Sequence, residues 1–166
     1  MATVQAEAVG IGIEQEQREG VVALLTRLLA DEQILYAKTR NYHWNVVGPL
    51  FHSLHELLEN QYQALAVRID EIAERTRALG APALGTLVEY KEYATLSESP
   101  GAYPEAMTMI ANLTADHESI IRHLRKDLKA CEEQYDDMGT SDFLTGLMEA
   151  HEKTAWMLRS FQQQHA

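Results

Sequence analysis

The stretch HWNVVGPLFHSLHELLENQYQALAVRIDEIAER, residues 43–75, decides the fold of this chain. After a break at Gly48-Pro49, apolar side chains recur every three or four positions, which is the spacing of an amphipathic helix. At about 100° per residue, one helix face carries six aliphatic side chains: Leu54, Leu57, Leu58, Leu65, Ile69 and Ile72. The pattern predicts a helix from about Leu50 to Leu79 that packs on a bundle core.

Three further long segments show helical spacing and are separated by few helix-breaking residues. They run from about Glu14 to Val46, from about Tyr103 to Tyr135 and from about Ser141 to Gln163. Thr140 or Ser141 is the expected N-cap of the last helix. The longer crossover from Ala81 to Ser99 holds a short helix around Thr86 to Tyr93. We therefore expect an all-α, ferritin-like four-helix bundle, with a short helix in the crossover between helices 2 and 3.

Length and composition bound the class of protein. The 166 residues fit a single domain, 1–166, in which residues 1–13 form a flexible N-terminal tail. The chain has no apolar run long enough to span a membrane and no basic, apolar signal segment at its start. Its single cysteine, Cys131, excludes an internal disulfide and fits a reducing compartment. We expect a cytoplasmic protein.

The formal net charge of −11 repels nucleic acid unless basic residues cluster locally. The candidate cluster is Arg122, Arg125, Lys126 and Lys129. Because it is interleaved with Asp127 and followed by acidic residues, we interpret it as a solvated helix face rather than a DNA-binding patch. An acidic surface instead attracts cations.

A second stripe on the residue 50–79 helix carries candidate metal ligands. His55 and Glu59 are spaced i, i+4, and so are Asp70 and Glu74, so that each pair can reach one metal ion from one helix face. Either pair alone is more typical of a solvated acidic stripe. Together with His43, just before the helix break, they favour a metal site.

Helix rise limits how these ligands can combine. Glu59 and Asp70 are separated by about 16 Å along a straight helix, whereas a ligand lies about 2 Å from its metal. Either each pair is incomplete, or the second pair comes from another chain. A twofold axis between antiparallel copies of this helix would place His55 and Glu59 of one copy opposite Asp70 and Glu74 of the other, twice.

The ligand types indicate the metal and the kind of site. Carboxylates with imidazoles suit iron better than a closed structural zinc site, which favours thiolates. Di-iron bundles with a site in the core carry Glu-x-x-His motifs on two helices, and this sequence has none. His117, His123 and His151 lack that partner, so we expect no metal site inside the bundle.

At these residues the sequence resembles the Dps family, the mini-ferritins also called DNA-binding proteins from starved cells. The resemblance covers about Glu14 to Phe161. Its specific parts are Asn41-Tyr42-His43-Trp44, Leu54-His55-Glu56, residues 70–75, and Lys153 with Trp156. It implies a homo-oligomeric cage, a dodecamer, in which Fe(II) is oxidised, usually by hydrogen peroxide and otherwise by dioxygen. Fe(III) mineral then collects inside and protects against oxidative stress.

The resemblance also assigns roles to residues. His43, His55 and Glu59 would bind iron from one subunit and Asp70 and Glu74 from its partner, with two iron ions per shared dimer-interface site. The family commonly has Asp where this chain has Glu59. Both side chains bind metal through a carboxylate, but the Glu59 side chain is longer by one methylene. Acidic residues at threefold pores would admit iron; Asp142 fits best, ahead of Asp137 and Glu133, and the alternative for each is a capping or surface carboxylate.

Three other side chains near the proposed site have simpler interpretations. For Trp44 and Trp156 we favour packing over a role in quenching oxidising equivalents. For His52, which points off the ligand stripe, we favour a surface or interface position.

The predicted function is therefore ferroxidase and iron storage. The alternative is a DNA-condensing nucleoid protein with secondary iron binding. Met1 to Gln17 contain no Lys or Arg but contain Glu7, Glu14 and Glu16, so the tail cannot release counterions from DNA, and we expect no nucleic-acid partner. A structural assembly with a vestigial site is opposed by the complete ligand set.

Overall fold

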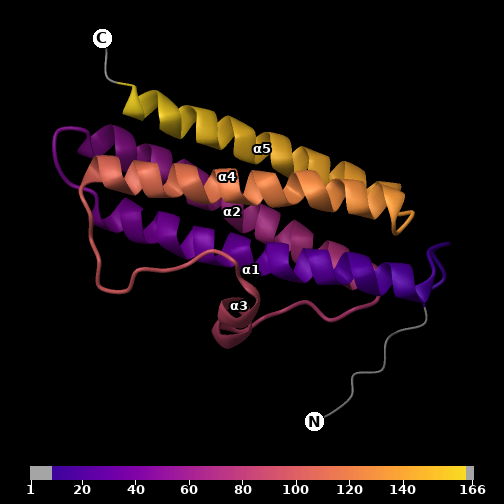
Figure 1. Ribbon diagram of the computed structural model, residues 1–166. Helices are drawn as coiled ribbons and strands as arrows, with labels where there is room; N and C mark the ends of the chain where they lie inside the picture. The colour runs from indigo at the N-terminus through magenta and orange to yellow at the C-terminus, as the bar shows by residue number, and fades with distance from the viewer. Residues whose placement is uncertain (1–8, 164–166) are drawn as a thin grey trace.

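The computed structural model describes residues 9–163, which form five helices and no strand (Figure 1). The helices are α1 (Gln15–Asn45), α2 (Phe51–Ala78), α3 (Leu87–Tyr93), α4 (Ala106–Glu133) and α5 (Met138–Gln162). Each predicted helix is present, and its ends lie within three residues of the expected ones. The expected tail lies partly outside the described residues; residues 9–14 precede α1 without helical structure.

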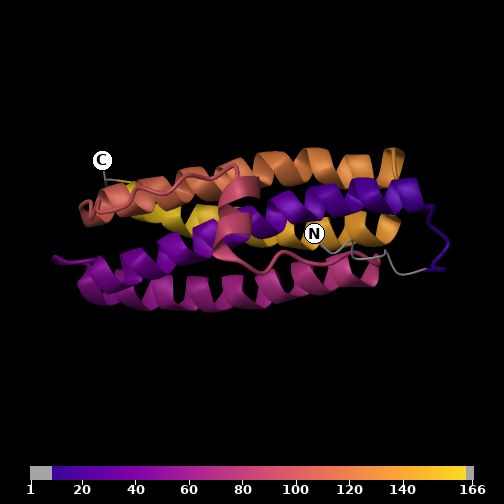
Figure 2. The same cartoon turned by 90° about the horizontal axis from the view of Figure 1, so that it is seen from below.

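The four long helices lie side by side, and α3 packs outside them against α1 (Figures 1 and 2). α1 packs chiefly against α2, and α4 against α5. The crossover that contains α3 returns along the length of the bundle, so α2 and α4 point in the same direction (Figure 1). This long crossover distinguishes a ferritin-like bundle from a simple up-down-up-down one, and it confirms the predicted fold class. No helix of the described residues is long and apolar enough to cross a membrane.

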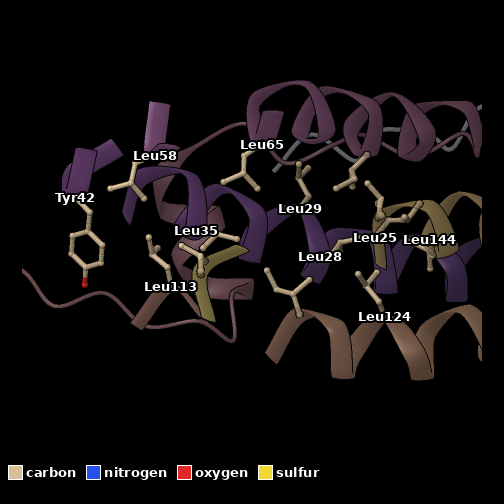
Figure 3. Close-up of a cluster of buried hydrophobic side chains, with 14 of the residues drawn as sticks. Leu25, Leu28, Leu29, Leu35, Tyr42, Leu58, Leu65, Leu113, Leu124 and Leu144 are labelled. Carbon is tan, nitrogen blue, oxygen red and sulfur yellow. The ribbon is translucent and has the colours of Figure 1, made fainter. Parts of the chain in front are cut away.

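Leucine side chains from all four long helices meet along the bundle axis (Figure 3). On α2, the predicted apolar face is confirmed. Leu54, Leu58, Leu65 and Ile72 are at most 1% exposed, and Leu57 and Ile69 are half-buried at the edge of the core. The orientation of α2 follows from this burial, and with it the direction of the ligand stripe.

The predicted N-cap of α5 was wrong. The helix begins at Met138, three residues earlier than expected, and Asp137 caps it by accepting a hydrogen bond from the backbone N–H of Thr140 at 2.9 Å. The guanidinium of Arg75 on α2 lies 2.9 Å from the same carboxylate. A carboxylate stabilises a helix N-terminus as well as a hydroxyl does, and the Arg75 contact fixes this one in place.

Candidate metal centre

His43 and His55 meet where α1 passes into α2. The short connection between the helices stacks the two imidazole rings, with centroids 3.8 Å apart and planes 18° from parallel. Nδ1 of His43 lies 2.8 Å from the backbone carbonyl oxygen of His55, and Nδ1 of His55 lies 2.9 Å from that of His43. Each histidine therefore holds the backbone of the other.

These reciprocal contacts determine where the ring protons lie. A carbonyl oxygen only accepts, so each Nδ1 carries the hydrogen that it donates. In a neutral ring Nε2 is then left with a free lone pair. Metal-binding histidines have this arrangement, because a hydrogen bond from the other nitrogen fixes the tautomer and the ring orientation.

Aromatic side chains surround the two imidazoles. Phe51 stacks on His55 with centroids 5.0 Å apart, and Tyr62 meets His43 edge-on at 5.3 Å. Arg40 lies over the ring of Trp44 at 4.7 Å. His43 is only 6% exposed and His55 is half-buried. The rings are thus held in place, as a binding site requires.

The carboxylates of the predicted ligand set lie along α2. Glu59 is half-buried one turn after His55, and its Oε1 makes only long contacts, 3.5 Å to the hydroxyl of Tyr62 and 3.4 Å to Nε2 of Gln63. Asp70 and Glu74 are exposed and have no hydrogen bond or ion pair to residues 9–163. None of these carboxylates is committed to another partner within the described chain.

One chain does not assemble the whole set. Among the described residues, no three His, Cys, Asp or Glu side chains lie close enough to hold a metal ion. α2 runs without interruption from Phe51 to Ala78, so the separation of about 16 Å between Glu59 and Asp70 stands. The structure brings together His43 and His55 and leaves Asp70 and Glu74 apart from them.

The remaining candidates differ in exposure. Asp142 and Glu133 are exposed, whereas Asp137 is 2% exposed and caps α5, as its alternative interpretation proposed. His52 is exposed, in agreement with the surface interpretation. The packing interpretation of the two tryptophans was wrong for a single chain, because Trp44 is 62% and Trp156 60% exposed. Both indole rings lie on the outer faces of their helices.

Sequence reasoning missed a buried polar group in the bundle core. Nε2 of His151 lies 2.5 Å from Oε1 of Glu32, and Nδ1 of His151 lies 2.8 Å from Nδ1 of His117. All three side chains are 0% exposed. The signal was present, because each of these residues falls in register with the leucines of its helix, where an apolar side chain is expected.

Comparison with known proteins gives a consistent result. The model of the ferritin-like domain family matches residues 22–165. A low-temperature-induced protein of Nostoc sp. PCC 7120 is 51% identical over 153 residues, 92% of this chain and 86% of that protein. DNA protection during starvation protein 2 of Bacillus anthracis is 40% identical over 85% of this chain and 95% of that protein.

Solved structures agree with these sequences. DpsC from Streptomyces coelicolor superposes with a TM-score of 0.95 at 27% identity, covering 99% of this chain and 98% of that one. A Dps protein from Vibrio cholerae, described as a member of the ferritin-like diiron-carboxylate superfamily, superposes with a TM-score of 0.88 at 29% identity, covering 95% and 99%. These matches extend over almost the whole bundle.

Proposed function

Because the chain belongs to the Dps family of ferritin-like proteins, we propose that it oxidises Fe(II) at sites shared between two copies of itself and stores the Fe(III) as mineral. The iron is the substrate. His43, His55 and Glu59 of one subunit would bind it together with Asp70 and Glu74 of a second subunit, and the assembly would be a dodecameric cage. The activity is that of an oxidoreductase protecting the cell during starvation and oxidative stress.

The observation that carries the proposal is the reciprocal hydrogen bonding of His43 and His55. It leaves two Nε2 lone pairs available on two stacked rings, one turn from the uncommitted carboxylate of Glu59. Imidazole and carboxylate together are ligands that suit iron, and few protein ligands leave positions open for an oxidant.

An exposed apolar surface next to the histidines supports a second copy as the source of the missing ligands. Trp44 is 62%, Val47 73% and Phe51 46% exposed beside the two rings. Leu87 and Val88 of α3 are 85% and 78% exposed, and they border the same groove as Trp44. Exposed large apolar side chains that gather near one site favour a protein interface there. A copy related by a twofold axis would cover it while bringing Asp70 and Glu74 to the histidines.

Two iron ions in one site match the chemistry of hydrogen peroxide. Each Fe(II) gives one electron, and peroxide takes both electrons with two protons to become two water molecules. The O–O bond breaks without releasing a hydroxyl radical, because neither electron arrives alone. Dioxygen is the alternative oxidant, and Asp142, exposed near the start of α5, is the proposed pore carboxylate for iron entry.

Mixed assembly tests whether the site is shared. Subunits carrying His43→Ala and His55→Ala are unfolded and reassembled in equal amounts with subunits carrying Asp70→Ala and Glu74→Ala, and Fe(II) oxidation by peroxide is followed optically. About half of randomly formed dimers are mixed, and each mixed dimer has one intact site out of two. We expect about a quarter of the wild-type number of active sites, although each parent alone is inactive.

The control is reassembled wild-type protein, and sedimentation confirms that every mixture forms the same particle. An inactive mixture of correctly assembled particles would mean that all ligands come from one chain. Full activity in the His43→Ala, His55→Ala parent would refute the ligand assignment itself.

We propose that DNA is not a partner, although relatives are named for DNA protection. Glu14 and Glu16 lie at the start of α1, and residues 1–8, which complete the acidic tail, lie outside the described residues. Residues 1–17 contain no Lys or Arg to release counterions from DNA, and the net charge of −11 repels its phosphates. Retardation of plasmid by the intact assembly at physiological salt would contradict this.

A further inference from the structure

A pocket of about 320 Å³ lies between α2 and α5, away from the two stacked histidines. α2 packs chiefly on α1 and α5 on α4, so these two helices leave space between them. The small side chains of Ala64 on α2 and Ala150 on α5 line this space. Leu57, Leu65 and Met157 provide apolar walls.

Two buried polar side chains, Gln61 and His117, line the pocket and have unused hydrogen-bonding atoms. Gln61 is 8% exposed, and neither its amide nitrogen nor its amide oxygen has a partner among the described residues. His117 is 0% exposed, and its Nε2 likewise has none. Native proteins pair nearly all buried polar atoms with protein groups or bound molecules, so these atoms are available to a polar ligand in the pocket.

The buried contacts of His117 with His151 and of His151 with Glu32 determine whether Nε2 of His117 donates or accepts a hydrogen bond at the pocket. A lone carboxylate at the position of Glu32 would be costly, and the positive charge that His151 exerts on its surroundings offsets it. His151 then donates from Nε2 to Glu32 and from Nδ1 to Nδ1 of His117. Since its Nδ1 accepts, a neutral His117 carries its own hydrogen on Nε2. His117 is therefore a hydrogen-bond donor at the pocket.

The charged groups around His117 are consistent with this assignment. Burial lowers the pKa of His117 well below its usual value, and the positive charges of His151 and Arg68 lower it further, so the ring stays neutral. Glu32 of α1 is compensated by His151 of α5. Arg68 of α2 and Lys153 of α5 both line the pocket, and neither forms an ion pair within residues 9–163.

We propose that the pocket between α2 and α5 binds a small oxyanion, with inorganic phosphate as its representative, between Arg68, Lys153, the Gln61 amide and the Nε2–H of His117. Two cations supply the charge, and the amide and imidazole supply fixed donors. The apolar walls strengthen these interactions by lowering the local dielectric constant. A metal cation would face two positive side chains, and the side-chain acceptor oxygens in the lining, on Asn60, Gln61 and Thr154, are all uncharged, so the pocket is suited to an anion.

Equilibrium dialysis of labelled phosphate against the assembled, iron-free protein tests the proposal. Iron is removed because mineral would itself adsorb phosphate, and the readout does not depend on iron oxidation. We expect saturable binding of one phosphate per subunit. Arg68→Gln and Lys153→Met should each weaken it by at least about tenfold, as expected for the loss of one charge-assisted hydrogen bond. Gln61→Glu, which keeps the shape but adds negative charge, should abolish it.

The controls are Arg122→Gln and Lys129→Met, which make the same substitutions at exposed positions of α4 and should leave binding unchanged. Sulfate should displace phosphate, since the site offers donors to any tetrahedral oxyanion. Equal losses in pocket and control variants would mean that phosphate binds through general surface charge, and the proposal would be wrong. It would also be wrong if wild-type protein showed no saturable binding, or if sulfate failed to compete.

Discussion

The protein contains two histidine pairs whose surroundings give them opposite roles. His43 and His55 lie beside the protein surface, and both donate to backbone carbonyls, so both Nε2 atoms remain available. His117 and His151 lie in the bundle core, and His151 is fully engaged by Glu32 and His117. A histidine that donates from Nδ1 to a backbone carbonyl keeps Nε2 free to bind a metal, as in the first pair. A histidine next to a buried carboxylate instead serves as its counter-ion, as His151 does for Glu32.

Removing the buried carboxylate should have the largest effect. Glu32→Leu leaves His151 without its partner at a position that is 0% exposed, and we expect a loss of about 3 kcal/mol in the free energy of unfolding. Denaturant unfolding of the assembled protein measures it. Glu59→Gln is the contrasting variant, expected to change stability by less than about 0.5 kcal/mol because Glu59 makes only long contacts. Equal stability losses would remove the distinction between the two pairs.

Removing the surface pair should affect chemistry instead. In particles carrying His43→Ala and His55→Ala, we expect Fe(II) oxidation by peroxide to slow by more than about 100-fold, since loss of even a hydrogen-bonding partner of a metal ligand costs 10- to 100-fold. The particle should still assemble. His52→Ala removes a nearby exposed histidine and should leave the rate unchanged. Slow iron oxidation by the His52→Ala variant would mean that the iron site lies nearer to His52 on α2 than we propose.

The different surroundings also explain what the sequence could reveal. Helix positions followed from the spacing of leucines such as Leu54, Leu58 and Leu65, because burial of one face is a local property of a helix. The ligand stripe was predicted on the same basis, and helix rise sufficed to show that Glu59 and Asp70 cannot share an ion within one chain. Capping by Asp137 was considered only as the alternative to a pore role, and its contact with Arg75, which is distant in sequence, was missed.

The buried pair was missed for a related reason. Glu32, His117 and His151 come from three helices, and nothing in any one helix shows that the three side chains meet. The exposure of Trp44 was also missed. A tryptophan is usually largely buried, but Trp44 lies on the outward face of its helix and is therefore exposed. The periodicity of the sequence therefore predicts which face of each helix is buried, but not which side chains of different helices contact one another.

Acidification should distinguish the pairs through stability. The pKa of His117 is lowered in the folded protein by burial, so this group contributes full stability above the unfolded-state pKa of about 6.5 and loses it as pH falls below that value. Between pH 7.5 and 5.5 we expect a loss of about 1.3 kcal/mol that is absent in His117→Gln. Asp116, whose pKa is raised by burial, contributes with the opposite sign in both proteins and cancels in the difference. Parallel pH profiles would show that folding does not shift the pKa of His117.

The smallest expected effect concerns the cysteine in the same core. Cys131 is 0% exposed, and burial, followed by the charges of Asp137 and Asp127, raises its pKa to about 12. The reactive species is the thiolate, which is scarce at neutral pH at such a pKa. We expect an aromatic disulfide reagent to leave the native assembly unlabelled over hours and to label one thiol per chain after unfolding. The same protection should hold in peroxide, so Cys131→Ser should leave the rate of iron oxidation unchanged. Rapid labelling of the native protein would show that the end of α4 opens. The buried side chains of Glu32, His117 and His151 could then also be reached by solvent.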